Sequence, residues 1–195
     1  YSNANFKAPN TSTNTFAFNF GLTYDLDGGE TYSLKKPEKK EKMSEPLRYN
    51  LVLRGGINES VVIDSGQYGF WIFSGYVYKR LVRKSAIQLG ADFFFSNFLK
   101  ELIRFQSISF PEMEVDADTD FKRIGLFVGH ELFINKMSLE TQLGYYVYYP
   151  FDFEGRVYNR IGLKRYFGDR FFGAVTLKSH GAAAEALEFG IGMRL

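Results

Sequence analysis

The sequence predicts an all-β protein, a transmembrane antiparallel β-barrel, and three observations support this prediction. Phe and Tyr are abundant, at 21 and 13 of 195 residues, and aromatic side chains suit the pleated faces of strands. Apolar and polar residues alternate with a period of two from one end of the chain to the other, as in strands with two different faces. The chain has no apolar run of about 18 residues, which excludes a membrane helix, whereas a barrel strand needs only about 9–11 residues with every second one apolar.

The alternation divides the chain into nine predicted strands. They are residues 14–24, 49–57, 67–79, 86–95, 121–133, 137–149, 157–167, 170–180 and 186–195. Charged residues lie in the middle of these strands, on the face opposite the apolar one. In a membrane barrel the two faces would contact lipid and lumen, whereas in a soluble sandwich they would be core and solvent. The strand lengths and the aromatic cluster at 145–153, which suits an interfacial girdle, favour the membrane interpretation.

This interpretation assigns individual residues to one side of the wall. Four charged residues are expected to face the lumen: Arg160, Lys164, Lys178 and Glu188. The lipid-facing set is expected to include Phe16, Phe18, Phe20, Leu177, Phe189 and Ile191.

The connections predict an orientation. In barrels of the outer-membrane type the C-terminus is periplasmic. The short turns at 81–85, 134–136 and 167–169 would then also be periplasmic, and the loops at 59–66, 96–120 and 150–155 would be extracellular. The segment 26–47 contains the charged run at 35–42 and is expected to be a solvated periplasmic loop. Nine strands is an odd number, so residues 1–195 are expected to form one barrel domain that is the C-terminal part of a larger, even-stranded barrel. The first and last strands are then not expected to pair with each other.

Composition excludes several classes of function. The net charge is +2 without a concentrated basic stripe, so no nucleic-acid partner is expected. The absence of Cys excludes disulfides, zinc–thiolate sites and Cys nucleophiles. The sequence contains no Walker loop, dinucleotide fingerprint or metal-ligand spacing, so no cofactor is expected.

The first fourteen residues, YSNANFKAPNTSTN, carry the most specific motif of the chain. A Ser2-Asn3 pair is followed by Pro9-Asn10 and then by Asn14, twelve positions after the Ser. This segment resembles the active-site segment of lipid A 3-O-deacylase (PagL-type) outer-membrane barrels, which reads His-x-Ser-Asn, a loop with Pro-Asn, and an acid twelve positions after the Ser. The rest of the chain, down to its final Glu-x-Gly-x-x-Met-x-Leu, is similar to the PagL-related acyloxyacyl hydrolase barrels of Gram-negative bacteria.

The resemblance implies a serine esterase that acts on an acyl ester of lipid A in lipopolysaccharide, integral to the bacterial outer membrane. Ser2 would be the nucleophile, Asn3 the oxyanion-hole residue, and Asn14 would stand where the family has its Glu. The His would be the residue directly before Tyr1. Asn14 lies two and four positions before Phe16 and Phe18, so it would share their lipid-facing side of the strand. This would place the site on the outer wall of the barrel, beside the lipid substrate.

Asn14 departs from the family pattern, and this departure supports an alternative function. An amide can orient a His, but it cannot stabilise the imidazolium as a carboxylate does. The alternative is therefore a catalytically inactive barrel of the same family that serves as a scaffold or subunit of an outer-membrane protein assembly, with other outer-membrane proteins as partners.

Two other groups of residues suggest chemistry. His180 is expected to face the lumen, where a Ser-His-Glu site with Ser179 and Glu188 is conceivable, but a structural network with Lys178, Glu188 and Arg194 is favoured. His130 is expected on the lipid-facing side, near the periplasmic end. Acids recur at every second position of the loop from Glu112 to Asp120, where solvation is favoured over a divalent cation shared with lipopolysaccharide phosphates.

Overall fold

The computed structural model describes residues 21, 45–59, 66–181 and 183–195. The predicted strand at 14–24, apart from Gly21, and the charged run at 35–42 lie outside the described residues. Within them the chain forms eight strands, β1 (Arg48–Glu59), β2 (Gln67–Val82), β3 (Ser85–Ser96), β4 (Arg123–Ile134), β5 (Met137–Tyr148), β6 (Val157–Phe167), β7 (Phe171–His180) and β8 (Ala183–Arg194). These strands agree with eight of the nine predicted ones to within three residues at each end.

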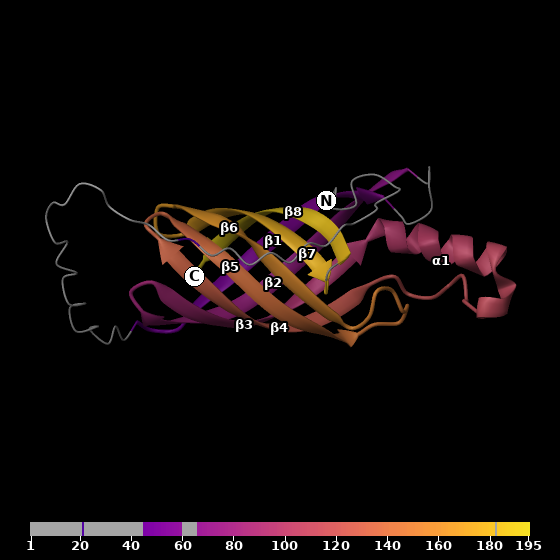
Figure 1. Ribbon diagram of the computed structural model, residues 1–195, viewed down its shortest axis with the longest axis horizontal. Helices are drawn as coiled ribbons and strands as arrows, with labels where there is room; N and C mark the ends of the chain where they lie inside the picture. Colours follow the sequence, from indigo (N-terminus) through magenta and orange to yellow (C-terminus); the bar gives the residue numbers. More distant parts are fainter. Residues whose placement is uncertain (1–20, 22–44, 60–65, 182) are drawn as a thin grey trace, which may run out of the picture.

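The strands form one closed antiparallel barrel in which each strand pairs with its neighbours in the sequence (Figure 1). β1 and β8 close it, with Leu53 opposite Ile191. The all-β barrel prediction is therefore confirmed. The expectation that this chain does not close into a barrel by itself is wrong, because β8 occupies the edge of β1 at which an additional strand would have entered.

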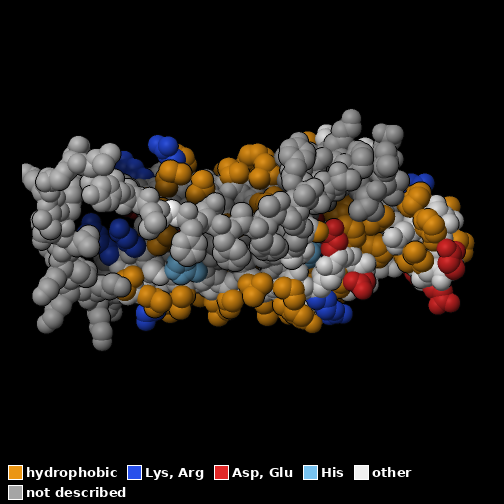
Figure 2. All heavy atoms as spheres, viewed as in Figure 1, with side chains coloured by type: hydrophobic (Ala, Val, Ile, Leu, Met, Phe, Trp, Pro, Cys, Tyr) orange, Lys and Arg blue, Asp and Glu red, His pale blue; other side chains and the backbone are white. Residues whose placement is uncertain are grey.

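The barrel wall is polar inside and apolar outside. The four charged residues expected in the lumen, Arg160, Lys164, Lys178 and Glu188, are each at most 1% exposed. Outside, Phe189 and Ile191 are 55% and 71% exposed, as expected. Figure 2 shows the apolar side chains along the outer surface of the barrel. The alternation along each strand thus separates a charged interior from an apolar exterior.

Small residues on the inner face make room for aromatic rings. The Tyr158 ring of β6 lies against Gly144 of β5, where an added Cβ would be 2.1 Å from the ring atom Cζ. The Phe172 ring of β7 covers Gly192 of β8 in the same way. Tyr158 also stacks on Tyr146, with ring centroids 4.9 Å apart. The rings and the charged groups together fill the lumen.

The two ends of the barrel differ. Tight turns join β2 to β3, β4 to β5 and β6 to β7 at the end where the C-terminus lies. At the other end β3 continues into the helix α1 (Asn97–Ser109), which projects beyond the strands and is followed by the short 3-10 helix η1 (Pro111–Met113) (Figure 1). No helix among the described residues is long and apolar enough to cross a membrane.

α1 lies where the sequence analysis expected only a loop. Its buried residues follow a helical spacing, with Phe98 and Leu99 one turn before Leu102 and Ile103. They pack on aromatic residues of the β5–β6 loop, including Phe153, whose ring is 5.3 Å from that of Phe98. The helix and this loop therefore form a second, smaller apolar cluster above the barrel mouth.

Candidate functional site: the polar lumen and its mouth

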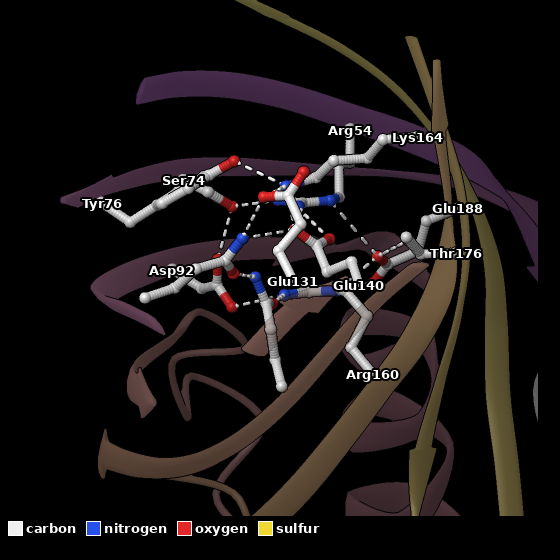
Figure 3. A network of polar contacts seen from close by, with 12 residues as sticks. Arg54, Ser74, Tyr76, Asp92, Glu131, Glu140, Arg160, Lys164, Thr176 and Glu188 are labelled. Carbon is white, nitrogen blue, oxygen red and sulfur yellow. Dashed lines mark hydrogen bonds and ion pairs between the residues drawn. The ribbon is translucent and has the colours of Figure 1, made fainter. Parts of the chain in front are cut away.

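Arg160 is at the centre of the lumenal polar network (Figure 3). Its Nη1 donates to Asp92 at 2.9 Å and to Gln142 at 2.6 Å, and its Nε donates to Glu188 at 2.7 Å. Glu188 also accepts a hydrogen bond from the Thr176 hydroxyl at 2.7 Å. One guanidinium thus joins side chains from β3, β5 and β8, three strands that are not neighbours in the barrel.

Arg54 and Lys164 extend the network. Arg54 donates to Ser74 at 2.5 Å and to Glu140 at 3.2 Å. Lys164 forms ion pairs with Glu140 and, at 3.2 Å, with Glu131. These groups are fully buried, and each buried charge has at least one partner of opposite sign, which offsets the cost of removing it from water. The network crosslinks the wall and fills the lumen with side chains.

A second polar cluster lies at the mouth, at the α1 end of the barrel. Its central group is the buried carboxylate of Glu185, which accepts from Arg123 at 2.5 Å and pairs with Lys178. Strict alternation would point Glu185 outward, because Ala184, Ala186 and Glu188, at the even-numbered positions of β8, face the lumen. The pairing between β7 and β8 shifts there, with Lys178 opposite Ala186 and Ser179 opposite Ala184. This β-bulge turns Glu185 into the lumen.

His180 joins the same cluster. Its Nδ1 is 3.0 Å from a carboxylate oxygen of Glu154 and 3.2 Å from one of Glu185, and its Nε2 is 3.2 Å from the Tyr146 hydroxyl. The donor atoms of Glu154, His180 and Glu185 lie within 4.8 Å of one another, close enough to share a metal ion. Arg123 and Lys178 already neutralise Glu185, however, so the electrostatics favour the ion-pair network over a divalent cation.

The β5–β6 loop that carries Glu154 is held over the mouth by Tyr149. The Tyr149 hydroxyl donates to the Phe153 carbonyl and accepts from the Phe153 amide at 2.5 Å. Burial raises the pKa of Tyr149, so the hydroxyl keeps the proton that it donates. Glu154 has φ 60°, in the left-handed region, and points its carboxylate back to His180.

The three predicted catalytic residues, Ser2, Asn3 and Asn14, lie outside the described residues, so their roles remain predictions. The structure does not form the conceivable site of Ser179, His180 and Glu188. Ser179 accepts from Asn159 at 2.7 Å, and Glu188 is bound by Arg160 and Thr176. The expected network of His180 with Lys178, Glu188 and Arg194 is also corrected. The carboxylates within hydrogen-bond distance of His180 belong to Glu154 and Glu185, not to Glu188.

His130 lies on the outer face near the tight-turn end, as expected. Its Nε2 is 2.7 Å from the Ser85 hydroxyl. The hydrogen bonds found for its ring within the described residues include no carboxylate, so this Ser–His pair lacks the third group that orients a catalytic imidazole. The loop acids from Glu112 to Asp118 are exposed, and Asp120 accepts from the Tyr148 hydroxyl at 3.0 Å.

Alternation could not have identified Glu185 and Glu154 as partners of His180. Glu185 is in the segment Ala183–Arg194, where three successive residues, Ala184, Glu185 and Ala186, are buried, and only the observed pairing locates the bulge. The inward-facing positions of Arg123, Lys178 and His180 in the strand alternation were the available signals for this cluster.

Comparison with known proteins gives one family. No curated protein matches the sequence. The family described as acyloxyacyl hydrolase, C-terminal domain, matches residues 47–195, a range that contains all eight strands and α1. Ser2, Asn3 and Asn14 precede the matched range. The chain therefore belongs to the acyloxyacyl hydrolase C-terminal domain family, as the resemblance to PagL-type proteins had indicated.

Proposed function

We propose that the barrel spans the bacterial outer membrane and that the protein hydrolyses an acyl ester of lipid A in lipopolysaccharide. Family membership is the observation that carries this proposal. The apolar exterior supports the membrane location, since the strands have 10 to 16 residues and about 9–11 suffice to cross the apolar core of a membrane.

The proposed chemistry is attack by the Ser2 hydroxyl on the ester carbonyl, which breaks the ester C–O bond and releases the lipid A alcohol; water then hydrolyses the acyl-Ser2 ester and frees the fatty acid. Asn3 donates to the oxyanion that forms, and Asn14 orients the imidazole that takes the Ser2 proton. The expected base is a His directly before Tyr1. The lumenal network of Arg160 and its partners contributes rigidity, because its charged groups are already bonded to one another.

The test compares lipid A from cells that produce wild-type protein, the Ser2→Ala variant or no protein. Mass spectra should show loss of one acyl chain with the wild type alone. Ser2→Ala should leave the heat-resistant barrel intact, which gel migration without boiling would report. Asn14→Glu should preserve or raise the rate, because a carboxylate stabilises the imidazolium.

A second candidate is a non-enzymatic barrel that serves as a scaffold in an outer-membrane assembly. Asn14 in place of an acid favours it, since an uncharged amide weakens the triad. Identical lipid A spectra from wild type, Ser2→Ala and the strain without protein would exclude the esterase and support the scaffold.

A further inference from the structure

We propose that the outer wall holds one phospholipid with an anionic headgroup. An acyl chain would occupy a groove across β6, β7, β8 and β1, with the phosphate beside Arg165. This inference rests on the proposed membrane location, but it is independent of the ester chemistry.

The groove has a volume of about 720 Å³ and an apolar lining. Its floor contains Gly55 of β1 and Gly173 of β7, and aromatic side chains border it, including Trp71, Phe167 and Phe189. The strand register shows its course, because Gly55 pairs with Trp71 and Phe189 on either side, while Gly173 lies opposite Arg165. It therefore crosses several strands and reaches Arg165 at the tight-turn end.

The glycine at position 173 leaves space that a side chain could fill. An added Cβ would meet Phe167 Cε2 at 3.4 Å and the Gly190 carbonyl oxygen at 3.9 Å, both ordinary contacts. This part of the groove is therefore open because residue 173 has no side chain, and a larger residue there would occupy the groove without displacing the backbone.

Arg165 is the cation that faces outward from the groove. The side chains of Lys164 and Arg54, which also border it, are buried in the lumenal network. The Arg165 guanidinium lies 5.9 Å from the centre of the Phe167 ring, and within the described chain it forms no ion pair. An exposed guanidinium without a carboxylate partner is suited to bidentate binding of a phosphate.

The charges at the barrel ends favour an anionic headgroup. Exposed or half-exposed basic side chains outnumber the acids Glu45 and Asp169 at the tight-turn end; these basic residues are Lys79, Arg80, Arg83, Lys84, Lys136, Arg165 and Arg170. At the α1 end exposed acids outnumber the exposed bases Lys100, Arg104, Lys122 and Arg156; these acids are Glu112, Glu114, Asp116, Asp118, Asp152 and Glu154. In Figure 2 the acidic side chains lie toward the α1 end, whereas Lys and Arg side chains are visible at both ends. A cationic rim attracts anionic lipids in the adjacent leaflet.

A second groove on the same wall provides an internal control. It has a volume of about 610 Å³ and is lined by apolar residues around Gly75, including Leu51, Val77 and Leu89. None of the described residues that line it is Lys or Arg. A Cβ at Gly75 would meet only Leu51 Cδ2, at 3.7 Å. Gly75→Leu therefore fills an outer groove that has no cation beside it.

The experiment is native mass spectrometry of the full chain, refolded in detergent and mixed with equal amounts of phosphatidylglycerol and phosphatidylcholine with identical acyl chains. Wild-type protein should retain one phosphatidylglycerol in preference to phosphatidylcholine. Arg165→Gln should lower this preference about fivefold, the effect of one interfacial cation. Arg165→Lys should give a preference between those of the wild type and Arg165→Gln, because the charge remains but the bidentate geometry is lost. Gly173→Leu should reduce retention of both lipids, whereas Gly75→Leu should leave both unchanged.

Each contrary result overturns a specific part of the proposal. Equal retention of the two lipids by the wild type, or an Arg165→Gln variant that behaves like the wild type, overturns the headgroup site. Equal effects of Gly173→Leu and Gly75→Leu overturn the groove. A wild-type chain that forms a heat-resistant barrel in detergent but does not insert into lipid vesicles refutes the proposed membrane location itself.

Discussion

Arg160 shows at the scale of single residues why the lumen is stable. It is fully buried and donates to Asp92, Gln142 and Glu188. Arg160→Met would leave two carboxylates without this partner, and breaking a buried pair typically costs about 3–5 kcal/mol. We therefore expect a large loss in the free energy of unfolding, measured by urea titration in micelles with the single Trp, Trp71, as the fluorescent reporter.

Lys122 is the matched control for this measurement. It pairs with Asp120 at 3.6 Å, with its side chain 51% exposed. Lys122→Met removes a similar charge from the surface, where an ion pair contributes about 1 kcal/mol or less. Equal losses for the two variants would contradict the assigned role of the lumenal network.

Parity in the sequence predicts which charged residues face the lumen, but not which partners they meet. Arg160 and Glu188 were assigned to the lumen from alternation, and both lie there. Glu185 has the wrong parity and enters the lumen only through the bulge. The mouth cluster around His180 could not be predicted, because it depends on this local shift and on a loop residue, Glu154.

Glycine and aromatic residues determine how β5 and β6 fit together. A Cβ at Gly144 would lie 2.1 Å from Tyr158 Cζ, and the Tyr158 hydroxyl donates to Asp92 at 2.8 Å. Gly144→Ala must displace this ring and its hydrogen bond. We expect a loss of about 1–3 kcal/mol, the usual range for overpacking, measured by the same urea titration.

Gly75→Ala distinguishes this steric effect from the general effect of replacing a glycine in a strand. Its Cβ has only an ordinary contact with Leu51, at 3.7 Å. We expect a change near zero or a slight stabilisation, since Ala loses less backbone entropy than Gly on folding. A Gly75→Ala loss as large as that of Gly144→Ala would mean that the Tyr158 ring is not the cause.

α1 shows the limit of prediction at the scale of elements. The strands were found because period two recurs eight times in the described chain, whereas the helix is a single segment inside a polar connection. Its apolar residues Phe98, Leu99, Leu102 and Ile103 have helical spacing. Their partners on the β5–β6 loop are about fifty positions away in the sequence, so the packing that stabilises the helix was not apparent from the local pattern.

At the scale of the whole molecule, the sequence predicts the strands and their faces but not how the barrel closes. Alternation specifies which side of a strand is apolar and carries no information on which strand completes the sheet. The predicted strand at 14–24 made the count odd and led to the expectation of a larger barrel. The pairing of β1 with β8 makes residues 48–194 a closed sheet without it.

This closure predicts that residues 45–195 fold without the preceding segment. Each of the eight strands has both neighbours within this range, and the lumenal network from Arg54 to Glu188 lies wholly inside it. The fragment should refold in detergent to a species with the circular dichroism of a β-barrel and the heat-modifiable migration of the full chain. It should release no fatty acid from lipopolysaccharide, because it lacks Ser2, Asn3 and Asn14. A fragment that remains unfolded while the full chain folds would show that residues before Glu45 stabilise the barrel, and a fragment that folds and still hydrolyses lipopolysaccharide would place the chemistry on the barrel itself.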